Sequence, residues 1–173
     1  MLVNETSVSK IGQYPSLADI QFTELGKKYN KVLPKEDLKN FKKAIGFHSH
    51  WGGAWSFVYL RRIFENLIFE TYQNHKTEIS LSETDFKWLR MSEKVETIEN
   101  FLPSSLLRMK AIYWILSKWV HELSEEECMK YFWVLKISIE LILDEKIEIK
   151  AKVEKDKKTE LEIQRISQQI SKS

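Results

Sequence analysis

The fold is decided by the stretch FVYLRRIFENLIFETYQ, residues 57–73. Its apolar positions recur at steps of three and four residues, which places them along one side of an α-helix. Val58, Ile63 and Ile68 widen this stripe, so that little of the circumference is polar. A helix that is apolar on most sides is buried in a protein core. The pattern therefore predicts a largely buried helix of about 20 residues, from near residue 54 to residue 73.

Helix-breaking residues are concentrated before this stretch. All five glycines lie before residue 54, and the 120 residues that follow contain a single proline, Pro103. Because glycine and proline determine where helices can stop, this asymmetry predicts long helices after Gly53 and a more broken N-terminal part. A parallel sheet would need glycine-bearing turns between its strands, and residues 54–173 offer none.

Serine caps and a second apolar stripe predict further helices. We expect Ser82 and Ser92 to cap two short helices, and Ser104 or Ser105 to cap a longer one that runs to residue 120. The sequence SEEE at residues 124–127 has the capping-box form, with a glutamate three residues after the serine. A clear helical stripe follows it at Cys128, Phe132, Leu135, Ile139 and Ile142.

These elements predict an all-α protein, a bundle of about five to six helices over residues 34–148. Residues 1–33 are expected to be irregular or to form a short helical segment. In residues 144–160, 12 of 17 residues are charged, so we expect residues 149–173 to continue as a charged helical tail in solvent. A partner-docking helix is the alternative for the tail, whose three late isoleucines fall short of a coiled-coil repeat.

Composition excludes several classes of protein. The chain has 173 residues, of which 43% are apolar, and a net charge of +2, so it is neither an acidic nor a strongly basic disordered chain. One cysteine, Cys128, excludes an internal disulfide and a cysteine-rich zinc site. No apolar run approaches membrane-spanning length, and the N-terminus lacks a signal-peptide pattern. We therefore expect a cytoplasmic protein that does not enter a membrane.

Lysines suggest one candidate binding surface. Seven lysines fall between residues 27 and 43. On a helix beginning at Lys35, the side chains of Lys35, Lys39, Lys42 and Lys43 share a face that points away from the apolar positions. Such a face can contact the phosphates of a nucleic acid, and the binding would be sensitive to salt. A merely solvated face is the alternative.

Two histidines precede a pair of glycines. His48 and His50 could share a metal only on an extended backbone, and no third ligand is indicated by spacing. We expect His48 to pack in the core instead, and we predict neither a metal nor a cofactor. Gly52 and Gly53 could seat a phosphate at the start of the following helix. We favour the alternative, that they permit close helix packing beside Trp51.

Two arginines and one histidine are candidates for catalysis. Arg61 and Arg62 lie within the most apolar helix, and we expect Arg61 to form a structural ion pair with Glu65. Alternatively, the arginines line a polar cleft with His121. His121 follows the predicted helix, which ends at residue 120. At the end of a helix it can act as a general acid or base. Alternatively, it stabilises the turn through a backbone hydrogen bond.

Two segments carry a family resemblance. The run FVYLRRIFE at residues 57–65 and the run ILSKWVHELS at residues 115–124, extended to residue 143, resemble signatures of an uncharacterised bacterial family. Together they resemble the HEPN superfamily of α-helical bundles, found in toxins, defence systems and RNA-processing proteins. The resemblance covers about residues 35–148.

The resemblance implies a function connected with RNA. Active HEPN proteins are metal-independent ribonucleases with an Arg-x(4–6)-His motif, usually completed across a homodimer. His121 matches the histidine, but the arginine would fall at Trp114, Ile115 or Leu116, none of which is basic. We therefore expect a non-catalytic module that dimerises and binds RNA or a protein partner, in bacterial stress or phage defence.

The alternative is an enzyme. A divergent endoribonuclease would use His121, with Arg61, Arg62 or Lys118 in place of the missing arginine.

Overall fold

The computed structural model describes residues 2–4, 7–9, 14–108, 112 and 123–171. These residues are mostly helical, as predicted for an all-α bundle with a long C-terminal helix. The described helices are α1 (Leu17–Tyr29), α2 (Lys35–Ser49), α3 (Gly53–Asn74), α4 (Glu83–Trp88), α5 (Met91–Thr97), the 3-10 turn η1 (Glu99–Phe101), α6 (Ser104–Arg108) and α8 (Glu125–Ile170). None of them is both long and apolar enough to cross a membrane.

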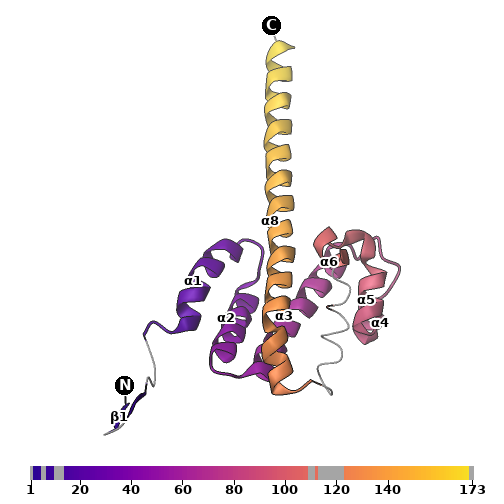
Figure 1. Ribbon diagram of the computed structural model, residues 1–173. Coiled ribbons are helices and arrows are strands. Elements are labelled where there is room, and N and C mark those ends of the chain that lie inside the picture. Colours follow the sequence, from indigo (N-terminus) through magenta and orange to yellow (C-terminus); the bar gives the residue numbers. More distant parts are fainter. Residues whose placement is uncertain (1, 5–6, 10–13, 109–111, 113–122, 172–173) are drawn as a thin grey trace.

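The strands form a small addition at the N-terminus. β1 (Leu2–Asn4) and β2 (Ser7–Ser9) pair antiparallel, with Val3 opposite Val8. This hairpin stands apart from the helices (Figure 1). It leaves the all-α class of the bundle unchanged.

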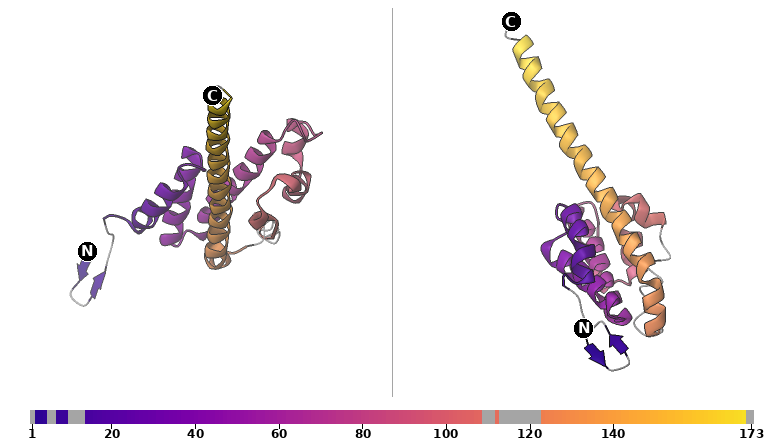
Figure 2. Two further views of the ribbon diagram at one scale, coloured as in Figure 1. Left: turned by 90° about the horizontal axis from the view of Figure 1, so that it is seen from above. Right: turned by 60° about the vertical axis from the view of Figure 1, so that its left-hand side comes forward.

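Helix α3 is the centre of the core. It packs against α2 and α8. In the view from above, α1 and α2 lie to one side of α8 while α4, α5 and α6 lie to the other (Figure 2, left). Phe57, Leu60 and Phe64 are fully buried, and each such side chain contributes about 1.5–3 kcal/mol by leaving water. The predicted bounds of this helix are confirmed to within a residue.

Helix α8 begins as the sequence predicts and continues far beyond the bundle. The backbone N–H of Ser124 donates to Glu127 (2.8 Å), and Ser124 Oγ accepts from the Glu127 N–H (3.2 Å), which completes the capping box. With 46 residues, the helix is about 69 Å long at 1.5 Å per residue. Every residue from 148 to 171 is exposed, and the tail rises clear of the other helices (Figure 1).

The helical part of residues 1–33 belongs to the bundle. Ser16 caps α1 by accepting from the Asp19 N–H at 3.1 Å, and α1 packs against α2. Tyr29 and Leu33 are buried in the common core. The sequence left the placement of this segment open, although Leu17, Ile20, Phe22 and Leu25 make it apolar enough to dock on the bundle.

Two of the predicted caps are wrong. Ser82 caps α4 as expected, but α5 begins at Met91, so Ser92 lies inside the helix. Ser104 and Ser105 likewise lie inside α6. Their backbone N–H groups donate to the carboxylate of Glu145 in α8, at 2.8 and 2.9 Å. A carboxylate from a distant helix thus replaces the local serine cap.

Candidate functional site

The four predicted lysines lie together on the outer side of α2. Lys35, Lys39, Lys42 and Lys43 are all exposed, and the helix buries the opposite side through Phe41, Ala44 and Ile45. A helical spacing of 100° per residue places the four lysines within about one third of the circumference. We call these residues the lysine face.

Two members of the lysine face have carboxylate partners. Lys42 Nζ lies 2.6 Å from Asp19 Oδ1 of α1, and Lys39 Nζ lies 3.7 Å from Glu36 Oε2. Hydrogen bonds from Lys42 and Ser16 lower the pKa of Asp19 to about 2. Lys42 therefore has a structural partner that remains charged at neutral pH, and the other three lysines form the more available part of the surface.

Aromatic side chains continue the lysine face toward the end of α2. The Phe47 ring stacks on Tyr59 of α3, with centroids 5.7 Å apart and planes 12° apart. Lys43 Nζ and the Arg62 guanidinium carbon lie 5.3 and 5.8 Å from the Tyr59 ring centroid. Two cations are thus held beside one aromatic ring by cation–π contacts. Sequence reasoning did not connect these aromatic residues to the lysines, because they come from two different helices.

Arg61 and Arg62 point to different environments. Arg61 Nε donates to Glu65 Oε1 at 2.7 Å, which confirms the predicted structural ion pair. Arg62 is exposed and lies at Tyr59. Lys118 and His121 lie outside the described residues. Of the four predicted catalytic residues, the structure therefore places Arg61 and Arg62, which are neighbours in the chain.

His48 packs in the core, as predicted. Its ring stacks on Phe132 of α8, with centroids 3.9 Å apart and planes 9° apart. Burial lowers its pKa, and its buried Nδ1 has no hydrogen-bond partner among the residues that the structure describes. Among the residues that the structure describes, no three histidine, cysteine, aspartate or glutamate side chains gather in a way that could hold a metal ion.

Gly53 permits close helix packing, as expected. A Cβ on Gly53 would lie 2.6 Å from the carbonyl oxygen of Glu125 and 2.9 Å from the backbone nitrogen of Met129, so glycine lets α3 approach α8 closely. The Ala54 N–H donates to the Glu125 carboxylate at 3.0 Å. The first turn of α3 therefore already has an anionic partner from the chain itself.

The burial of one carboxylate, Asp37, was not predicted from the sequence. Asp37 is 3% exposed and its Oδ1 accepts from the side-chain amides of Asn66 (2.7 Å) and Asn40 (3.4 Å). Burial raises its pKa despite these bonds. In the sequence, Asp37 resembles a surface residue whose charge offsets those of nearby lysines. However, it lies four residues before Phe41, and this spacing puts it on the buried side of α2. It ties α2 to α3.

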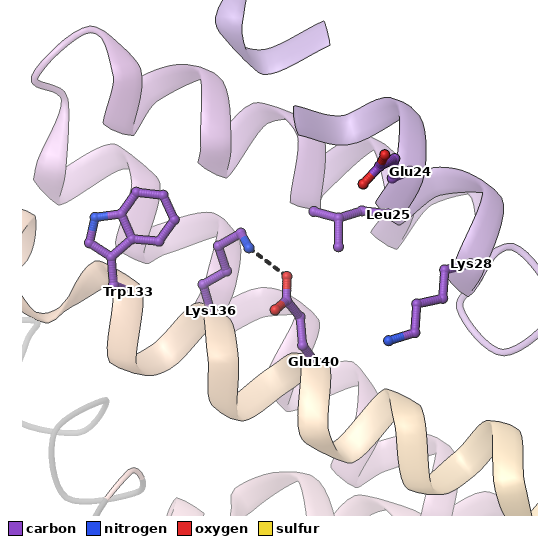
Figure 3. A pocket seen from close by; sticks show the side chains of 6 residues that line it. All are labelled: Glu24, Leu25, Lys28, Trp133, Lys136 and Glu140. Carbon is purple, nitrogen blue, oxygen red and sulfur yellow. Dashed lines mark hydrogen bonds and ion pairs between the residues drawn. The ribbon is translucent and has the colours of Figure 1, made fainter. Parts of the chain in front are cut away.

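A groove of about 480 Å³ runs between α1 and α8. Figure 3 shows that its lining comes from the two helices. The lining residues are Glu24, Leu25, Lys28, Trp133, Lys136 and Glu140.

Both lysines of this groove are paired. Lys136 Nζ lies 2.5 Å from Glu140 Oε1, and Lys28 Nζ lies 2.6 Å from Asp144 Oδ1. The hydrogen bond to Asp144 raises the pKa of Lys28. Since these charges are already neutralised within the chain, the groove is a weaker candidate for an anionic ligand than the lysine face.

Comparison with family models, curated proteins and solved structures finds no match to this chain. The HEPN resemblance therefore stays a prediction.

Proposed function

We propose that the chain is a HEPN-like interaction module of the bacterial cytoplasm that binds RNA through the lysine face of α2, in stress response or defence. The observation that carries this proposal is the exposure of four lysines on one side of a single helix. Lysine contacts with phosphates release counterions, and they provide most of the affinity of sequence-independent nucleic-acid binding.

The proposal is tested by measuring RNA affinity as a function of salt. Fluorescence anisotropy of a labelled RNA is recorded for the wild type and for the triple variant Lys35→Gln, Lys39→Gln and Lys43→Gln. Lys42 is retained because Asp19 holds it. For single-stranded RNA, the slope of log affinity against log salt becomes shallower by about 0.7 for each phosphate that the variant no longer neutralises.

A matched control removes three charges from the solvated tail. The variant Lys155→Gln, Lys157→Gln and Lys158→Gln has the same net charge as the α2 variant, and all three positions are exposed. We expect it to keep the wild-type affinity and salt slope. Equal losses in the two variants, or no RNA binding by the wild type, would contradict the proposal.

We further propose that binding occurs without cleavage. Trp114, Ile115 and Leu116 stand where an active HEPN motif needs arginine, and Arg61 is engaged by Glu65. RNA incubated with the protein in EDTA should remain intact. Cleavage that His121→Ala abolishes, with the helical circular-dichroism spectrum unchanged, would instead establish the ribonuclease.

Dimerisation is the remaining part of the proposal. α8 carries a row of exposed apolar side chains at helical spacing, Val134, Ile137 and Leu141. The opposite side of this part of α8 is packed in the core. An exposed apolar row of this kind can bind the same row of a second copy of the chain. A homodimer would also double the number of lysine faces available to one RNA.

A further inference from the structure

An exposed aromatic patch lies where α2 joins α3. Phe47, Trp55 and the half-buried Tyr59 form its packed part, and the exposed Trp51 stands in the turn between the two helices. Trp51 is 80% exposed and Trp55 is 60% exposed, and the Phe47 ring bridges Trp55 and Tyr59, with its centroid 6.3 Å from that of Trp55. Large aromatic side chains are usually buried, so a group of them on the surface marks a binding site.

Trp51 occupies a backbone position that favours glycine. The Gly52 N–H donates to the Phe47 carbonyl (2.8 Å) and the Trp51 N–H donates to the His48 carbonyl (3.2 Å), the two bonds of a Schellman motif that ends α2. Trp51 has φ 61°, a left-handed conformation that is strained for a bulky residue. Since most of its side chain is in solvent, packing does not explain why a tryptophan stands there.

Cations border the patch. Lys43 and Arg62 both lie beside Tyr59, and neither takes part in an ion pair between described residues. Lys43 also belongs to the lysine face, so the cationic and aromatic surfaces are continuous. This charge favours a polyanion over an uncharged or basic partner.

We propose that the aromatic patch stacks unpaired nucleobases, while Lys43 and Arg62 hold the adjoining phosphates, so that the ligand is single-stranded RNA. Alternating aromatic and basic side chains are the means by which proteins bind single strands, because every base has a flat face that can stack. In a duplex these faces are covered by neighbouring base pairs. This inference rests on the proposed function and specifies the class of RNA.

The test compares two tryptophan variants on two forms of RNA. Trp51→Gly and Trp55→Ala are titrated by anisotropy with a labelled single strand of about 12 nucleotides, within the site sizes of single-strand binders, and with the blunt duplex of the same strand. Each variant should bind the single strand about 5- to 150-fold more weakly, the range for removal of one base stack. Their affinity for the duplex should be unchanged.

The controls separate stacking from folding. Trp51→Gly removes the backbone strain, so it should unfold at a temperature no lower than the wild type. Trp88→Ala removes a tryptophan that is 85% exposed on α4, away from the lysine face, and should leave both affinities unchanged.

Each contrary outcome has a distinct meaning. Wild-type affinity of both patch variants for the single strand would overturn stacking and leave the lysine-face proposal standing. Failure of the wild type to bind either RNA would overturn both. If the patch variants bind RNA normally but no longer dimerise in light scattering, the patch is a protein contact and the stacking inference is wrong.

Discussion

Gly53 lies where α3 and α8 approach each other closely. The backbone of α8 occupies the space that a Cβ would need, and backbone atoms cannot move aside as the end of a side chain can. The residue type at this position is therefore set by packing between helices rather than by a turn. A close approach of this kind also brings Glu125 within reach of the first turn of α3.

Substitution Gly53→Ala should destabilise the protein by about 1–3 kcal/mol, the range for overpacking in a tight site. Thermal unfolding followed by circular dichroism measures the change.

Gly26→Ala is the matched control for that substitution. The three atoms nearest to its Cβ would all belong to the Phe22 ring in the same helix, the closest at 3.0 Å. The gain in helix propensity is worth up to about 1 kcal/mol. Equal destabilisation by the two substitutions would contradict the role given to close packing at Gly53.

At the scale of elements, α8 supplies carboxylates to the starts of two other helices. Glu125 accepts from the first turn of α3, and Glu145 accepts from Ser104, Ser105 and the Ser105 hydroxyl in α6. These bonds satisfy N–H groups that have no partner inside their own helix. Partial burial acts to raise the pKa of Glu145, but the hydrogen bonds from Ser105 and Ser104 outweigh it, so that the pKa is lowered.

Glu145→Gln should lower the free energy of unfolding at pH 7 by about 1–2 kcal/mol, because the neutral amide is a weaker acceptor and one of its two ends donates. The folded pKa lies below the ordinary 4.5. The stabilisation is therefore fully present above about pH 4.5 and is lost as the pH falls through the folded pKa. Urea titrations at several pH values should show the two proteins converging in acid.

Glu148→Gln provides the reference for that experiment. Glu148 lies on the same helix and is exposed. We expect its substitution to leave stability unchanged at every pH. A constant difference between wild type and Glu145→Gln down to the lowest pH would refute capping by the charged form.

At the scale of the whole molecule, α8 has one buried and one exposed apolar side. One side, which packs against α3, is buried and includes Phe132, Leu135 and Ile139. A different side exposes Val134, Ile137 and Leu141, whose burial would require a second molecule. The solvated tail beyond residue 147 extends the same helix without joining the core.

Ile137→Glu should convert the proposed dimer to a monomer, because it places a charge at the middle of the exposed apolar row. Multi-angle light scattering across a range of concentrations measures the molar mass of each protein in solution.

Leu161→Glu is the corresponding control, since Leu161 is exposed on the tail, well beyond this row. A wild-type monomer at every concentration, or the same mass for both variants, would remove dimerisation from the proposal.

Elements that depend on local spacing were predictable from the amino-acid sequence. The buried stripe of α3 and the Ser124 capping box follow from relations three and four residues apart, which a helix converts directly into contacts. The solvated tail follows from its high content of charged residues. The grouping of Lys35, Lys39, Lys42 and Lys43 on one exposed side was predictable for the same reason.

Features that join distant parts of the chain could not be predicted in this way. The capping of α6 by Glu145, the burial of Asp37 against Asn66 and the meeting of Phe47 with Tyr59 each depend on how two helices dock. Local pattern does not specify which helix faces which, because many apolar stripes can pack together with similar energy. The candidate binding surface therefore has two origins, a lysine face set by local spacing along α2 and an aromatic patch created where α2 meets α3.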